Sequence, residues 1–170
     1  MLKRSCLLMV LAFLLLSAGV AVAQEADNKA APCSSPEYRQ FDFWLGEWTV
    51  TDKDGKVLGR NRITSILGGC ALEENWSSAG GNTGTSYNIY DRSRKVWHQT
   101  WVDGSGLLLT IEGGLLDGSM ILEGVIRSPK GDRRQRITWT PLEDGRVRQH
   151  WEAAAEGQEF KTLFEGFYAK

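Results

Sequence analysis

Glu74 is the acidic residue whose position in the sequence points most directly to chemistry. It lies two residues after Leu72 and two before Trp76, and residues two apart share one face of a β-strand. If that face is the interior, a carboxyl group is buried where no arginine is expected, so it must be hydrogen-bonded, partly hydrated or protonated near neutral pH. Such a group could orient a ligand or transfer a proton. If Trp76 instead lies at the rim of the fold, Glu74 reaches water.

Two glutamines alternate with tryptophans along other segments. Gln99 is flanked at alternate positions by Trp97 and Trp101, and Gln149 lies two residues before Trp151. Small-molecule sites combine apolar walls with a few placed polar groups. Alternatively, the two amides bond each other or the backbone in a filled core. The candidate ligand-binding residues are Glu74, Trp76, Asn88, Trp97, Gln99, Trp101, Trp139, Gln149 and Trp151.

Familiar signatures of catalysis and of metal binding are missing. The sequence contains no G-x-S-x-G, H-E-x-x-H, P-loop or G-x-G-x-x-G motif. With two histidines and no closely spaced cysteine pair, it predicts no metal site and no cofactor. A net charge of −1 leaves no basic surplus for nucleic acid or anionic lipid. An enzyme is therefore an alternative rather than the first expectation.

The first 23 residues are typical of a cleavable signal peptide. Lys3 and Arg4 precede the apolar run 7–16, and small residues end at Ala23. We expect an exported protein, periplasmic or secreted, with no membrane insertion after cleavage. A flexible leader over 24–36 and one domain over 37–170 should follow.

Two cysteines remain after the predicted cleavage, because Cys6 is removed with the signal peptide. In an oxidising compartment, Cys33 and Cys70 are expected to form a disulfide. Two buried free thiols are the alternative.

Turn signals recur about every 12 residues from Asp54-Gly55 onward. The segments between them are rich in β-branched and aromatic residues, whereas helix is expected only as a short turn around Glu37 to Leu45. Consecutive hairpins leave exposed edges unless the sheet closes, so the sequence predicts an all-β, up-and-down antiparallel barrel. The expected strands are 47–53, 57–68, 70–77, 85–91, 94–102, 106–113, 119–127, 133–140, 146–154 and 159–168.

Alternation along these strands assigns their faces. The charged sets, Arg134 with Arg136 and Arg146 with Arg148, should face outward, with Glu152 balancing them. The strand carrying Asn88 stays open, because Tyr87 and Ile89 compete with Ser86, Asn88 and Tyr90 for its inner face. The interior should contain Trp97, Trp101, Trp139, Trp151, Leu107, Leu109, Ile111, Phe160 and Phe164.

The segment 41–48, FDFWLGEW, resembles the opening motif of an uncharacterised family of exported bacterial proteins. Later segments fit the same pattern, among them 69–72, 74–76, 86–91, 97–103, 137–140 and 147–152. More distantly, Gly46-Glu47-Trp48 after a helical turn resembles the entry of calycins, the superfamily of lipocalins, fatty-acid-binding proteins and nitrobindins. The resemblance implies a calycin-like barrel of about ten strands, with the turn plugging one end and Phe41, Phe43, Trp44 and Trp48 packed there.

Nitrobindin-like barrels hold haem through an inward histidine. The resemblance therefore raises the question whether His98 or His150 faces inward and holds haem. Each histidine neighbours a tryptophan, and neighbours in a strand face opposite sides. Burying the tryptophans is worth more than turning an imidazole inward. We therefore expect both histidines to face outward and no haem to bind.

The first functional expectation is a non-catalytic barrel that binds a small apolar or amphipathic molecule in a cavity lined by tryptophan. One alternative is a lipocalin-like enzyme, an isomerase or lyase, with Glu74 as acid or base. The other is a structural or interaction domain with a filled core.

Overall fold

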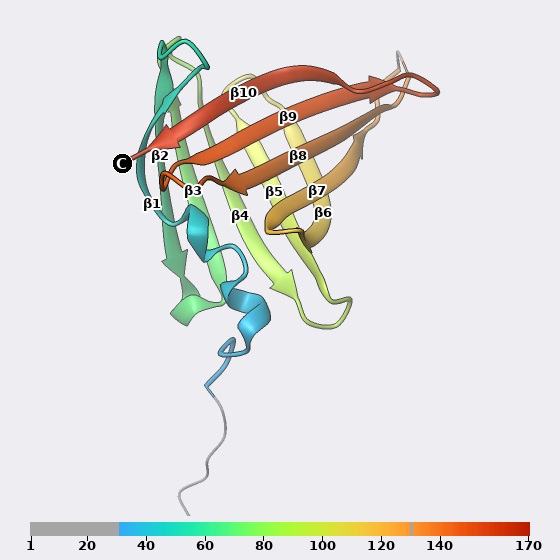
Figure 1. Cartoon of the computed structure of the whole chain (residues 1–170). Helices are drawn as coiled ribbons and strands as arrows, with labels where there is room; N and C mark the ends of the chain where they lie inside the picture. The colour runs from blue at the N-terminus through green and yellow to red at the C-terminus, as the bar shows by residue number, and fades with distance from the viewer. Residues whose placement is uncertain (1–30, 130) are drawn as a thin grey trace, which may run out of the picture.

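Ten antiparallel strands form a closed barrel, in which each strand pairs with the next and β1 also pairs with β10 (Figure 1). The structure is a computed structural model that describes residues 31–129 and 131–170. The expected signal peptide and most of the expected leader lie outside these residues. The all-β, up-and-down prediction is confirmed. The strands are β1 Gly46–Thr51, β2 Val57–Ile66, β3 Ala71–Ser78, β4 Thr83–Asp91, β5 Val96–Asp103, β6 Leu108–Leu116, β7 Ser119–Ile126, β8 Arg133–Pro141, β9 Val147–Ala155 and β10 Lys161–Ala169.

Tight turns place the strands where the turn signals predicted them. Between β6 and β7 only Asp117 and Gly118 lie outside the strands, with φ of 48° and 79°. Positive φ at both positions is the geometry of a two-residue hairpin whose twist matches the strands. Asp-Gly suits it because both residues tolerate left-handed backbone.

Two short 3-10 turns, η1 Pro36–Arg39 and η2 Asp42–Trp44, close one end of the barrel. Phe41 and Trp44 are fully buried and stack with their ring centroids 4.9 Å apart. Trp139 packs against both rings, and the Trp97 indole donates a 3.1 Å hydrogen bond to Gln40. In Figure 1 these blue turns lie at the lower end, opposite the β1–β2 hairpin. The helical turn predicted around Glu37 to Leu45 thus fills the barrel end with aromatic rings.

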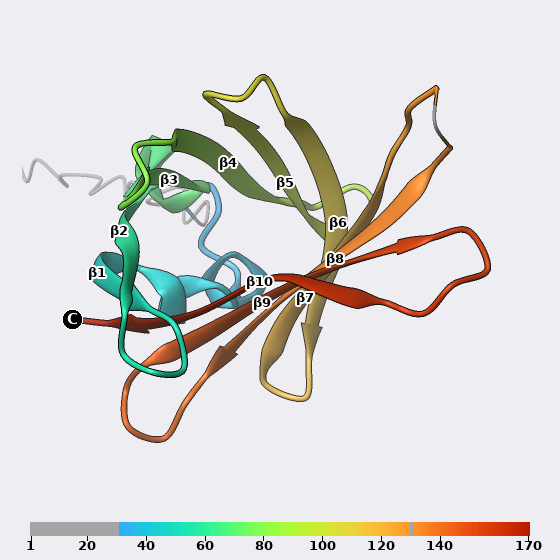
Figure 2. The same ribbon diagram turned by 90° about the horizontal axis from the view of Figure 1, so that it is seen from above.

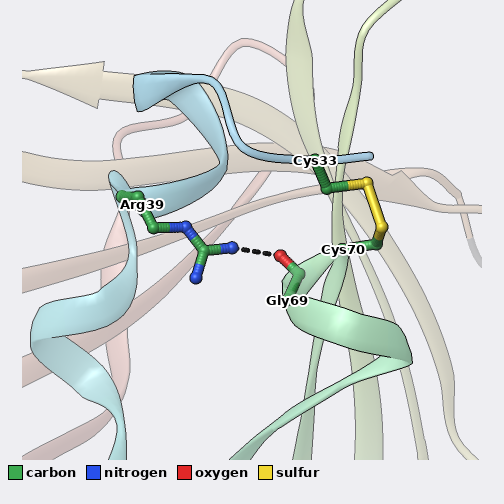
Figure 3. Close-up of a disulfide and its surroundings, with 4 residues drawn as sticks. All are labelled: Cys33, Arg39, Gly69 and Cys70. Carbon is green, nitrogen blue, oxygen red and sulfur yellow. Dashed lines mark hydrogen bonds between the residues drawn. A yellow bond between two sulfur atoms is a disulfide. The ribbon is translucent and has the colours of Figure 1, made fainter. Parts of the chain in front are cut away.

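A disulfide joins Cys33, just before η1, to Cys70, which follows the 3-10 turn η3 Leu67–Gly69 (Figure 3). Arg39 of η1 also donates a hydrogen bond to the carbonyl oxygen of Gly69. The predicted pairing is confirmed. It fastens the plug, formed by residues 36–44 of η1 and η2, to the β2–β3 connection. No helix in residues 31–129 or 131–170 has the length and apolar character needed to cross a membrane.

The predicted face assignments hold for most strands. The structure also shows the inner face of β4, which the sequence left open. Trp97 and Trp139 are buried, as are Leu109 and Ile111. On β4 the polar residues Ser86 and Asn88 are fully buried, whereas Tyr87 is 53% exposed and Ile89 39%. The outer arginines form ion pairs, including Arg136 with Glu152 at 3.0 Å and Arg148 with Glu165.

The prediction that Phe160 faces the interior is wrong. Phe160 lies on the outer surface, where the guanidinium carbon of Arg136 is 4.1 Å from its ring centroid. The pairing of β10 with β9 shifts between Thr162 and Phe164, which leaves Leu163 as an extra residue. Such a bulge reverses the alternation, so Phe164 faces inward while Phe160 does not. Leu107, also predicted inside, precedes β6 and is only half-buried.

Candidate ligand-binding site

A cavity of about 310 Å³ occupies the barrel interior on the side away from the plug. It reaches the β1–β2 and β3–β4 hairpins through Leu58 and Ser78, whereas the plug packs on Trp97 at the opposite end of β5. Figure 2 shows the β9–β10 hairpin extending to the side away from the helical turns. The lining residues are Leu58, Glu74, Trp76, Ser78, Asn82, Gln99, Trp101, Leu109, Ile137, Gln149, Trp151, Phe164 and Tyr168.

Glu74 lies on the inner face of β3 and is only 4% exposed. Asn61 donates a 2.7 Å hydrogen bond to its Oε1, and Ser86 donates one of 2.6 Å to its Oε2. Burial raises the pKa of Glu74 to about 7, although the hydrogen bonds from Ser86 and Asn61 act in the opposite direction. The carboxyl group is therefore buried and hydrogen-bonded, and close to its titration point at neutral pH.

From Ser86 the hydrogen bonds continue across β4 and β5. Asn88 donates a 2.9 Å hydrogen bond to the Ser86 hydroxyl, and Gln99 donates one of 2.8 Å to the Asn88 carbonyl oxygen. Asn88, in the middle of this row, is fully buried and does not line the cavity, whereas Gln99 does. Each buried polar group in this arm has a partner, which is the condition for keeping it inside a core.

From Asn61 a second arm runs toward β9 and β10. Asn61 donates a 3.3 Å hydrogen bond to the hydroxyl of Tyr168, and that hydroxyl donates to Oε1 of Gln149. Burial raises the pKa of Tyr168 well above its usual value, so the phenol stays protonated and can donate. Within the described chain no hydrogen bond joins Gln99 to Gln149, so the two amides end separate arms of one polar network.

Two tryptophans pack closely against inward glycines of neighbouring strands. A methyl group added at Gly59 would lie 2.6 Å from Cη2 of Trp76, and one added at Gly84 would collide with the Trp101 ring. Each indole thus covers the Cα of an inward glycine on another strand. Both tryptophans also line the cavity, so part of each indole is accessible to a ligand.

The remaining aromatic walls are Trp151 and Phe164. The Trp151 indole donates a 2.9 Å hydrogen bond to Gln135, and the Phe164 ring meets Trp76 edge to face with centroids 6.1 Å apart. Gln135 is buried on the inner face of β8, between the outward Arg134 and Arg136. The hydrogen bond restrains the Trp151 ring, and the edge-to-face contact packs Phe164 against Trp76.

Of the nine candidate residues, the structure brings six to the cavity and leaves three elsewhere. Asn88 is buried between Ser86 and Gln99, and the plug covers Trp97 and Trp139. The cavity residues are Glu74, Trp76, Gln99, Trp101, Gln149 and Trp151.

Sequence reasoning missed Asn61 and Tyr168. Asn61 is two residues before the buried Ile63, so alternation alone would have placed it inside.

Both histidines lie on the outer surface, as predicted. His98 contacts Glu112 and Thr100, and His150 contacts Thr162. Among the described side chains, neither imidazole lines the cavity.

The sequence matches no known family model, and no curated protein matches it either. The functional argument therefore rests on the geometry of the cavity.

Proposed function

We propose that this protein is an exported, non-catalytic binding protein that holds a small amphipathic molecule inside its barrel. The observation that carries the proposal is the cavity of about 310 Å³. Its walls are apolar, and its polar floor consists of the hydrogen-bonded residues Glu74, Gln99, Gln149 and Tyr168. Binding sites for small molecules have this composition. A core filled by its own side chains would leave no such space, which argues against a purely structural domain.

The polar floor supports a ligand with at least one polar group. Glu74, Gln99, Gln149 and Tyr168 line the cavity from four different strands. The network between them fixes their positions before any ligand arrives, and such preorganisation favours affinity.

The disulfide supports an oxidising compartment. Cys33 and Cys70 are bonded, and disulfides persist chiefly in exported proteins. Together with the signal peptide expected over residues 1–23, this favours a periplasmic or secreted location.

Binding of a neutral apolar fluorophore, N-phenyl-1-naphthylamine, tests the proposal. Fluorescence should rise and saturate with the native protein, and it should fall sharply with Leu58→Trp, which fills the cavity near its mouth. Leu108→Trp is the matched control, because Leu108 is 60% exposed on the barrel surface. Equal binding by both variants, or none by the native protein, would refute an interior site. Native mass spectrometry of protein from its own host should then reveal a retained molecule.

A second candidate is an isomerase or lyase in which Glu74 transfers a proton. The favouring observation is that this carboxyl lines the cavity with a pKa of about 7, near the optimum for acid–base work at neutral pH. Incubation of metabolite extracts in heavy water tests it by mass spectrometry. An enzyme would introduce deuterium into some metabolite, and Glu74→Gln would abolish this exchange. No exchange above background would eliminate the candidate.

A further inference from the structure

The cavity carries a negative group with no positive partner. Of the residues lining it, Glu74 is the acid, and no lysine, arginine or histidine of the described chain joins it there. Both carboxylate oxygens receive hydrogen bonds from neutral donors, Asn61 and Ser86. Buried charges are normally paired, so the ionised form of this site lacks a counter-ion that a ligand could supply.

The aromatic walls suit the same ligand. Trp76 and Trp101 pack on Gly59 and Gly84, and both indoles also border the cavity. Trp151 borders it as well. The faces of aromatic rings are electronegative and attract cations, tryptophan most strongly.

We propose that the bound molecule is an organic cation, a quaternary or protonated amine with an apolar substituent, whose charged nitrogen lies between the Glu74 carboxylate and the indoles of Trp76, Trp101 and Trp151. This inference rests on the proposed binding function and specifies its ligand class. A carboxylic acid of the same size is disfavoured, because its charge would meet Glu74 with no cation to offset the repulsion. A neutral molecule would leave the ionised carboxylate unpaired.

The ionisation of Glu74 should then control affinity. The groups facing its carboxyl are Asn61 from β2, Ser86 from β4 and, through Asn61, Tyr168 from β10. Tyr168 is the one that titrates among them, and it stays neutral because its pKa is raised. On β3 the neighbouring Glu73 faces away, toward the outer surface.

Three probes of similar shape test the charge preference by isothermal titration calorimetry. They are benzyltrimethylammonium, its neutral isostere neopentylbenzene and the anion phenylacetate. At pH 8 the cation should bind about tenfold or more tightly than the isostere, and the anion most weakly. Because Glu74 has a pKa of about 7, the affinity for the cation should be about tenfold lower at pH 6 than at pH 8, while that for the isostere stays constant.

Two variants locate the effect. Glu74→Gln should abolish both the preference for the cation and its pH dependence while leaving the isostere bound. Glu73→Gln removes an acid from the outer face of the same strand and should change neither. The pH series on the native protein tests the proposal even if Glu74→Gln fails to fold.

The outcomes separate the ligand class from binding itself. If neopentylbenzene binds as tightly as benzyltrimethylammonium or more tightly, the proposal that the ligand is a cation is overturned. The proposed binding function then stays intact. A preference for the cation that survives in Glu74→Gln and at pH 6 also overturns the proposal. If none of the three probes binds, both the ligand class and an accessible interior site are refuted.

Discussion

Ser86 and Glu74 are direct cross-strand partners, and the serine hydroxyl donates a 2.6 Å hydrogen bond to Oε2 of the carboxyl group. The register of β3 against β4 therefore places a donor directly against the acid of the polar floor. The buried acid is held by neutral groups, which leaves the cost of its ionisation only partly offset.

Stability should fall as Glu74 ionises. Its folded-state pKa of about 7 lies above the usual 4.5, so the folded protein binds the proton more tightly than the unfolded chain. The stabilisation that comes from this tighter proton binding is complete below pH 4.5. It is lost as the pH rises through 7, so the free energy of unfolding falls by about 3 kcal/mol. Urea unfolding from pH 4.5 to pH 8 measures this. Glu74→Gln should remove that part of the decline, and identical pH profiles for the two proteins would contradict it.

Ser86→Ala should destabilise the protein more at pH 8 than at pH 4.5. The substitution removes a donor to the charged carboxylate, a loss of about 1–3 kcal/mol, and the protonated acid depends on that donor less. Ser77→Ala, at an exposed position on the neighbouring strand β3, is the control. Chemical denaturation at both pH values gives the comparison, and an equal loss at both would argue against a special role for the ionised form.

Gly84→Ala should disturb the cavity through Trp101. The added methyl group collides with the indole, so the ring must leave the wall and enter the space for a ligand. We expect a loss of about 1–3 kcal/mol in stability and weaker binding of N-phenyl-1-naphthylamine. Gly114→Ala is the matched control, because a methyl group there meets nothing within 4 Å. Similar effects of the two substitutions would show that Trp101 does not depend on Gly84.

Removing the disulfide should lower stability and spare binding. The bond closes a loop with a sequence separation of 37, so Cys33→Ser with Cys70→Ser should cost about 4 kcal/mol in the chain-entropy model. The bond lies at the plugged end, away from the cavity mouth. Guanidinium denaturation and fluorophore titration of the double variant test both statements. In the native protein, thiol titration under denaturing conditions should find neither Cys33 nor Cys70 free.

Haem should not be retained after gel filtration. The two imidazoles are engaged on the outer surface, His98 by Glu112 and His150 by Thr162, and neither reaches the cavity. Absorbance spectra before and after the column measure this. A retained Soret band that disappears in His98→Ala or His150→Ala would contradict it.

Local sequence determined the strands, the turns and most of the faces. Alternation of the kind seen at Trp97, Gln99 and Trp101 fixes which side chains share a face, because the side-chain period of a strand is two. Asp117-Gly118 similarly fixes its own turn. The export signal and the presence of two cysteines after the predicted cleavage were enough to predict that Cys33 and Cys70 pair.

The tertiary structure decided everything that depends on register and depth. Both faces of β4 carry large side chains, and only pairing with β3 placed Ser86 rather than Tyr87 against Glu74. The bulge at Leu163 reversed the alternation and sent Phe160 outward. Trp97 and Trp101 share a face, yet the plug covers one and the cavity exposes the other. Periodicity along a strand gives the direction of a side chain, whereas barrel closure and the plug set what it meets there.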